Sequence, residues 1–449
     1  MYLDLSRVRF DAAKHYSAVL LQQGRVILDS DMTEQNAILQ HYLRTVVADL
    51  IGPAASPAGA AGFALTPGSA GDLAVSAGRM YVDGILAETG PDGTTYLTQP
   101  DGYLDPDQDA LPSAGPYVVY LRVWERSVTF CQDPDIREVA LGIHGPDTTG
   151  RLQVVWQIAF WPVPDAKATQ DAAMADWEQW ITTLYQPAGP LRARATQPED
   201  SATDICSVSP QAQYRGRENQ NYRVEIFRSG AAAPPAKKGR AATSAGPTAT
   251  FVWSREMGSV VFAIQDLAGA EVTLASLGRD LPSGLELGDW VEVVDDASAS
   301  RIADDQAPGP TRALFQVMAI DAVNCVVTLD RDPAGDIAGT GTNPALHPLL
   351  RRWDAALADV TEGGWLDLEA GVQIQFPGVT GSEPAQYRSG DYWLIPARTV
   401  LGDVIWPQDD TGPQALPPAG ISYHYAPLAF VAAGTSEPTV VRTTFGPVA

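Results

Sequence analysis

The longest helical pattern of the sequence lies within residues 14–53, where it follows a short apolar stretch that predicts a strand. Apolar residues recur there at separations of three and four, as on one face of an amphipathic helix. These positions are Met32, Ile38, Leu39, Tyr42, Leu43, Val46, Val47 and Leu50. Asp31 is expected to cap the first free N–H groups, and Gly52 ends the pattern because glycine accepts the left-handed conformation beyond a helix. The spacing therefore predicts a helix over residues 31–51.

Two amide side chains interrupt the apolar stripe of this helix. Gln35 and Asn36 fall within the stripe, whereas His41, Arg44 and Ala48 fall on the opposite side. One interpretation is a helix that lies on its own domain with the amides at the edge. The other is a self-associating helix, in which polar positions fix register and oligomer number. In that second case, the predicted assembly interface consists of Gln35, Asn36, Ile38, Leu39, Tyr42, Leu43, Val46 and Leu50.

The composition favours β structure for the rest of the chain. Of its 449 residues, 40 are glycine and 35 are proline, and only 19% are charged, which indicates many turns and short strands. The length allows two or three domains with substantial cores. We therefore predict a mainly β, multidomain fold of β-sandwich or small-barrel type. An N-terminal strand–helix segment and a second short helix complete it.

The charge balance restricts the partners. A net charge of −24 excludes wrapping of nucleic acid and attraction to an anionic bilayer, because both require clustered Lys and Arg. No run of 18 apolar residues and no N-terminal apolar core of a signal peptide is present, so we expect cytoplasmic synthesis and no direct membrane insertion. Cys131, Cys206 and Cys325 lie too far apart in sequence to suggest a disulfide framework or a metal-ligand cluster.

Strand and turn signals divide the chain into five predicted segments. Apolar, β-branched runs at 117–130 and 151–163 predict the core of the first β domain, and Asp83-Gly84 predicts a hairpin turn. The segments are an arm and assembly helix (1–54), a first β domain (55–165), a connector with a second helix carrying Trp177 and Trp180 (166–221), a second β domain (222–431) and a C-terminal tail (432–449).

The second β domain is predicted from many short strands. Residues 222–227 and 249–255 predict strands on either side of an Ala/Pro/Gly-rich insertion, 229–248, which we expect to be exposed and mobile. Five further apolar runs between 260 and 331 suggest a small barrel or sandwich. Gly-Asp dipeptides at Gly288, Gly390 and Gly402 each precede an apolar run, which indicates a repeated turn.

Catalytic, cofactor-binding and metal-binding motifs are not found. The sequence lacks a phosphate-binding glycine loop, an HExxH pair and a GxSxG nucleophile turn. The histidines, at positions 15, 41, 144, 347 and 424, never occur at metal-ligand spacing. We therefore predict no catalytic residue, no cofactor and no metal site, and expect that the protein is not an enzyme.

Acidic clusters offer weak alternatives. The run 105–109 resembles the beginning of a calcium loop, but Ala110 replaces the required glycine and Pro116 the terminal glutamate, so a solvated turn is expected. A second oxygen-ligand site would combine 295–296 with 304–305. Trp124 and Trp365 lie beside acidic residues and would line a sugar groove, or else anchor β-sheet cores.

Several motifs resemble a known family. Residues Arg7–Ile38 fit the pattern RxxFDxxKHYSxVLLQQGRVxLDxDxxEQxAI, and later segments GDWVEVVDD, HPLLRRWD, GDYWLIPAR and HYAPLAFV continue the likeness to about residue 431. This pattern resembles an uncharacterised domain family associated with contractile injection systems and phage tail-like particles. The sequence departs from the usual form at Ser30, at Met32 and in the insertion.

The resemblance implies a role in a particle. We expect a structural component at the baseplate or its periphery, which binds other subunits, forms a homo-oligomer and acts by protein–protein assembly. The particle would act inside the producing cell or after release. The alternatives are a receptor- or glycan-binding tail fibre or spike module, which requires an exposed groove, and a polysaccharide hydrolase, which requires two facing acids.

Overall fold

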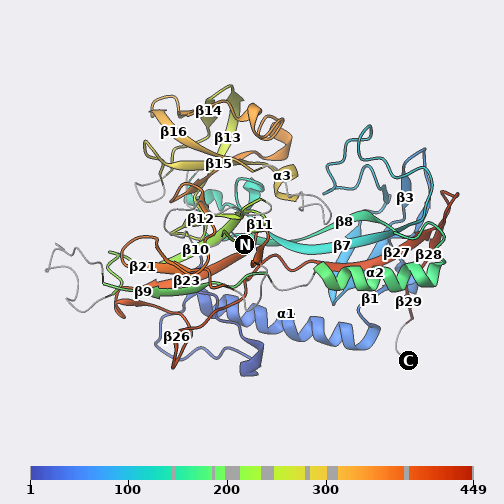
Figure 1. Cartoon of the computed structure of the whole chain (residues 1–449), viewed down its shortest axis with the longest axis horizontal. Coiled ribbons are helices and arrows are strands. Elements are labelled where there is room, and N and C mark those ends of the chain that lie inside the picture. The colour runs from blue at the N-terminus through green and yellow to red at the C-terminus, as the bar shows by residue number, and fades with distance from the viewer. Residues whose placement is uncertain are drawn as a thin grey trace. The chain divides into compact units, whose positions relative to one another are not determined.

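The computed structural model describes residues 2–142, 147–184, 188–197, 213–233, 247–278, 284–300, 312–378 and 384–446 (Figure 1). Over these residues the protein is mainly β, as predicted. Contacts divide the chain into two units, each built from distant segments. Unit 1 comprises Met1–Arg7, Ser127–Arg151 and Pro187–Ile421, and unit 2 comprises Val8–Arg126, Leu152–Gln186 and Ser422–Ala449. The division of the chain into the five segments given above stays a prediction.

Unit 2 contains three β-sheets in its described residues. In strand order they are β28 (Pro438–Val440), β27 (His424–Val431), β7 (Tyr117–Val128) and β8 (Arg151–Pro162); β29 (Thr444–Phe445), β1 (Ala54–Pro57), β4 (Gly78–Val82) and β5 (Ile85–Thr89); and β2 (Leu65–Pro67), β3 (Leu73–Val75) and β6 (Thr94–Thr95). The predicted Asp83-Gly84 hairpin is confirmed, since it joins β4 to β5 with both residues at positive φ.

Residues 117–121 of strand β7 are all apolar, and the packing of the strand explains why. Alternate side chains of a strand point to opposite faces of the sheet. Val119 and Leu121 pack into one core, whereas Val118 and Tyr120 pack into another with Trp177 of α2 (Gln170–Leu184). Both faces of the sheet are therefore covered, and Figure 1 shows α2 running along it. The second predicted helix is confirmed.

Unit 1 contains a closed barrel and several smaller sheets. The barrel order is β13 (Val261–Ala268), β14 (Glu271–Leu274), β17 (Val326–Leu329), β16 (Leu314–Asp321), β15 (Trp290–Val294) and β18 (Leu349–Trp353). The other sheets are β19 (Ala358–Asp359), β12 (Thr250–Ser254), β10 (Gln220–Arg228), β23 (Tyr392–Arg398) and β24 (Asp403–Val404); β20 (Trp365–Asp367), β21 (Val372–Gln375) and β9 (Arg192–Ala195); β11 (Gly230–Ala231) with β22 (Gln386–Tyr387); and β25 (Gln408–Asp409) with β26 (Gly412–Pro413).

The barrel is the small β domain expected from the sequence. Val291 and Val293 of β15 point into its interior, together with Phe315 of β16, because alternate residues of a strand face the same side of the sheet. The closing strand β18 was missed, because LLRRW lacks an apolar–polar alternation. The short helix α3 (Asp296–Ser300) follows β15 directly.

The repeated Gly-Asp dipeptides are turns, as predicted. Gly288, Gly390 and Gly402 have φ values of 91°, 89° and 61°, which favour glycine, and a strand begins within two residues of each. The 3₁₀ helices are η1 (Ala12–Lys14), η2 (Ala58–Ala60), η3 (Pro134–Ile136), η4 (Val139–Leu141), η5 (Pro333–Gly335) and η6 (Pro344–Leu346). Among the described residues, no helix has the length and apolar character needed to cross a bilayer.

Candidate assembly interface

Helix α1 (Asp29–Ile51) begins two residues earlier than the sequence predicted. Asp31 is not the residue before the helix but lies in its first turn, where its carboxylate accepts the N–H of Leu28 at 3.1 Å and pairs with Arg9. The backbone hydrogen bond and the pairing lower the pKa of Asp31. The predicted end is confirmed: Gly52 has a φ of 84° and donates its N–H to Ala48 at 2.8 Å.

One side of α1 lies on its own unit, and it is the side that the sequence placed opposite the apolar stripe. Arg44 forms an ion pair of 2.6 Å with Glu125 of β7. The His41 ring lies 5.5 Å from the Phe10 ring. The backbone of Arg44 also lies directly against Gly84, in the β4–β5 turn. The polar side chains of His41 and Arg44 therefore contribute intramolecular contacts of α1.

The apolar stripe is instead largely exposed. Leu39, Tyr42, Leu43 and Leu50 are 48%, 65%, 60% and 63% exposed. Among the remaining predicted interface residues, Asn36 is exposed, Gln35 and Val46 are half-buried and Ile38 is buried. Helix α1 therefore lies on its own unit through the side opposite the stripe, and most of the stripe is left uncovered in the single chain. Self-association through these residues stays a prediction.

An N-terminal arm, residues 15–28, extends the exposed apolar surface. Leu20 and Val26 are each 84% exposed, and Leu21 and Ile27 are also exposed. The arm contacts α1 through a hydrogen bond of 2.8 Å from the Val19 N–H to the Gln35 side chain. The sequence predicted a strand here, but the structure has no strand in residues 15–28. Its apolar pattern therefore reflects an uncovered surface.

Gly84→Ala is expected to loosen the packing of α1 on unit 2. A Cβ at this position would lie 2.4 Å from the Arg44 carbonyl oxygen, so the helix must shift. We expect a loss of about 2–4 kcal/mol in the free energy of unfolding, together with faster amide hydrogen exchange in α1. Gly24→Ala is the matched control, because Gly24 has a similar positive φ but open space around it. Equal effects of the two variants would contradict the close contact.

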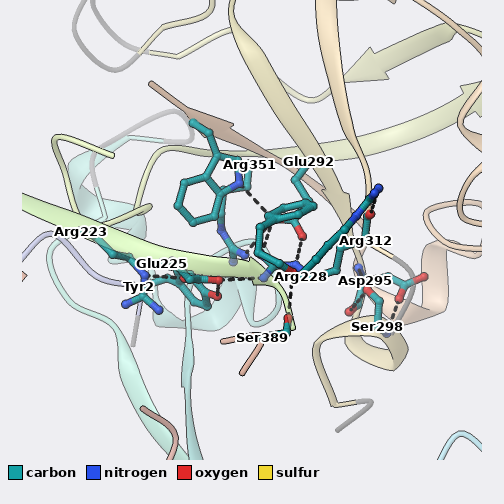
Figure 2. A network of polar contacts seen from close by, with 12 residues as sticks. Tyr2, Arg223, Glu225, Arg228, Glu292, Asp295, Ser298, Arg312, Arg351 and Ser389 are labelled. Atoms are coloured by element: carbon teal, nitrogen blue, oxygen red, sulfur yellow. Dashed lines mark hydrogen bonds and ion pairs between the residues drawn. The ribbon is translucent and has the colours of Figure 1, made fainter. Parts of the chain in front are cut away.

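A buried network of charges lies in unit 1 (Figure 2). Glu225 of β10 accepts hydrogen bonds from Arg223 at 2.6 Å, from Arg312 at 2.9 Å and from the Tyr2 hydroxyl at 2.9 Å. Burial opposes ionisation of Glu225, but the guanidinium groups of Arg223 and Arg312 outweigh it and lower the pKa of Glu225 to about 2. The network therefore contains a buried carboxylate with satisfied hydrogen bonds.

Aromatic rings complete this network. The Arg223 guanidinium lies 4.2 Å from the ring centre of Tyr2 and 3.7 Å from that of Tyr392, as in cation–π contacts. Glu292 of β15 accepts hydrogen bonds from Arg312 at 2.7 Å and from the Trp353 indole at 3.0 Å. The network thereby joins β10 to the barrel. The sequence signal for this network was the presence of charged residues within otherwise apolar strands.

A polar cleft of about 500 Å³ also lies in unit 1. Its Arg255 side chain pairs with Asp354 at 2.8 Å and with both oxygens of Glu369 at 2.6 and 2.7 Å, and the Tyr222 hydroxyl donates to Glu369 at 2.8 Å. Burial and the nearby Asp354 raise the pKa of Glu256 to about 7. The acids Asp354 and Glu369 are thus cross-linked through one arginine, which fixes the loops that carry them.

The acidic clusters and Trp124, which were weaker candidates in the sequence, have structural roles in the described part of the chain. The Asp105 and Asp109 carboxylates accept backbone N–H groups of their own turn. Asp295 accepts the N–H groups of Ser298 and Gly341. Trp124 is buried and cannot line a groove.

Several predicted features fall outside the described residues: Cys206, His144, 304–305 and residues 234–246 of the insertion. Where the structure is described, it contains no group of three or more His, Cys, Asp or Glu residues placed to hold a metal. Cys131 and Cys325 are free thiols. Burial raises the pKa of Cys131 to about 12, so its thiol stays protonated at neutral pH.

Comparison with known proteins identifies one family. No curated protein and no solved structure matches the chain. A family model described as "Family of unknown function (DUF6519)" matches residues 1–179 and 182–442, which is nearly the whole length. The match includes the N-terminal arm, α1 and both units. This chain therefore belongs to the DUF6519 family.

Proposed function

We propose that this protein is a structural component of a contractile, phage tail-like injection particle, at the baseplate or its periphery, and that it acts by protein–protein assembly. The observation that carries the proposal is the apolar surface of the arm and α1. It is exposed in the single chain, and it lies within the segment whose motif resembles particle-associated proteins. Monomeric proteins rarely expose large contiguous apolar patches unless another molecule covers them.

The acidic character of the chain is consistent with assembly. A net charge of −24 keeps separate copies soluble through mutual repulsion. In a particle, many copies are held at high local concentration, so modest individual interfaces become persistent. The partners are accordingly other particle subunits and further copies of this chain.

Isolation of particles from producing cells tests the proposal. Wild-type protein is expected to sediment with intact particles. The double variant Leu20→Asp/Leu21→Asp should be at least tenfold depleted, because it places charges on the exposed arm. Val323→Asp is the matched control, since Val323 is 91% exposed in the β16–β17 turn of unit 1. Absence of the wild-type protein from purified particles would overturn the proposal.

A receptor- or glycan-binding module is the second candidate, and the polar cleft around Arg255 favours it. Hydroxyl-rich ligands need convergent donors and acceptors, which this cleft provides through charged and tyrosine side chains. Binding to a glycan array that is lost in Arg255→Met, without association with particles, would favour this function. Turnover of a polysaccharide that depends on Glu256 would instead identify a hydrolase.

A further inference from the structure

The exposed residues of α1 have the spacing of a coiled-coil seam. Proceeding along the helix, successive members are separated by four, three, four, three and four residues, which is the spacing of the two core positions of a heptad repeat. These residues, here called the seam, are Met32, Asn36, Leu39, Leu43, Val46 and Leu50. Val46 is half-buried and the other five are exposed. A partner helix could therefore pack along the whole seam.

The contacts of α1 with its own unit leave the seam free. At 100° per residue, His41 and Arg44 project from the side of the helix opposite to the seam, and both contact unit 2 there. Ile38, which is buried, also lies off the seam. Copies could therefore associate through the seam without breaking these intramolecular contacts.

We propose that the seam binds the same helix of further copies of this chain, in a parallel and in-register bundle. This inference rests on the proposed assembly function and deepens it by naming the partner and its orientation. The observation that selects the orientation is Asn36, the polar residue of the seam. In a parallel, in-register bundle the Asn36 amides meet and hydrogen-bond to one another. An antiparallel pair would place each amide against the apolar far half of the seam, where its donors are unsatisfied.

The near absence of charged residues beside the seam allows copies of the chain to associate. The positions that flank the seam are Thr33, Gln35, Gln40, Tyr42, Val47 and Asp49. Only Asp49 among them is charged, so the helices escape the repulsion that the net charge of −24 imposes elsewhere. The surface of α1 that would be covered thus carries a single charge, that of Asp49, which suits a self-complementary interface of an acidic protein.

The arm supplies the additional area that a short bundle needs. The seam spans about 27 Å at 1.5 Å per residue, and helix pairs of fewer than three heptads are marginal on their own. Leu20, Leu21, Val26 and Ile27 are exposed on the arm that precedes α1. Covering them in the same assembly would add apolar burial at about 25 cal/mol per Å².

Cysteine cross-linking in the full-length chain tests the orientation. Met32→Cys and Leu50→Cys lie at opposite ends of the seam. A parallel bundle is expected to give 32–32 and 50–50 disulfides when each variant is oxidised mildly, and no 32–50 disulfide when the two are mixed. Thr45→Cys is the exposed control off the seam and should not cross-link. The parent chain controls for the native cysteines, and circular dichroism confirms folding.

Two substitutions test the role of individual seam residues by solution mass. Leu43→Asp should convert the multimer to a monomer, because it buries a charge in the seam. Asn36→Leu should tighten association at least tenfold and also permit 32–50 disulfides, because the only polar determinant of register is removed. A mixture of the Met32→Cys and Leu50→Cys variants that yields only 32–50 disulfides would overturn the proposal, and so would a wild-type chain that is monomeric at all concentrations.

The two proposals fail in different ways. A monomeric chain that is nevertheless present in isolated particles would overturn the bundle and leave the particle function standing. A parallel multimer that is absent from isolated particles would overturn the particle function and leave the bundle standing.

Discussion

Glu225→Gln is expected to lower the free energy of unfolding of unit 1 by about 3–5 kcal/mol at pH 7. The substitution keeps the shape of the side chain but removes the negative charge that pairs with Arg223 and Arg312. Arg223 is only 1% exposed, so its charge would stay buried without its closest counter-ion. Urea unfolding monitored by tryptophan fluorescence measures the loss.

The effect should depend on pH in a defined direction. In an unfolded chain a glutamate titrates near pH 4.3, whereas in the folded protein the pKa of Glu225 is about 2. A depressed folded pKa contributes stability above the unfolded pKa, and this contribution is lost as the pH falls toward 2. The difference between the wild type and Glu225→Gln should therefore shrink between about pH 5 and pH 2. Glu271→Gln on the exposed side of β14 is the control and should change stability by less than about 0.5 kcal/mol at every pH.

Trp353→Ala is expected to destabilise unit 1 by about 3–5 kcal/mol. Trp353 of β18 is 1% exposed and packs with Phe227 and Leu314. Its truncation leaves a cavity, and it also removes the indole donor that bonds Glu292 at 3.0 Å. Urea unfolding followed by far-UV circular dichroism avoids the change in tryptophan fluorescence.

Trp353→Phe separates the two contributions to that loss. The phenyl ring retains most of the packing but cannot donate to Glu292, so a smaller loss of about 1–2 kcal/mol is expected. Equal losses in the Ala and Phe variants would mean that the hydrogen bond, and not the packing, dominates. A loss below about 1 kcal/mol for Trp353→Ala would contradict its role as a core residue.

The elements that were predicted from the sequence are those whose pattern lies within one short, continuous segment. Helix α1 was predicted because its apolar spacing and Gly52 lie in one continuous segment. The hairpin at Asp83-Gly84 was predicted because the turn conformation depends on those two residues alone. The predicted start of α1 was wrong by two residues. Either a capping position or a place in the first turn allows Asp31 to accept a free backbone N–H, so the residue type could not distinguish them.

Features that depend on distant residues could not be predicted. Strand β18 closes the barrel although LLRRW lacks a strand pattern, because its neighbours β13 and β15 supply the pairing. Glu225 accepts hydrogen bonds from both Tyr2 and Arg312, which lie 310 positions apart in the sequence. Only folding reveals that these charges share one buried site.

The sequence by itself determined that this chain is mainly β, that it carries a long N-terminal amphipathic helix, and that Asn36 interrupts the apolar stripe, because these follow from composition and residue spacing. It could not determine which side of that helix would be covered. An apolar stripe has the same periodicity whether it faces its own core or another molecule. The tertiary structure decided this point, because Arg44 reaches Glu125 and its backbone packs against Gly84, which turns Leu39, Leu43 and Leu50 toward solvent.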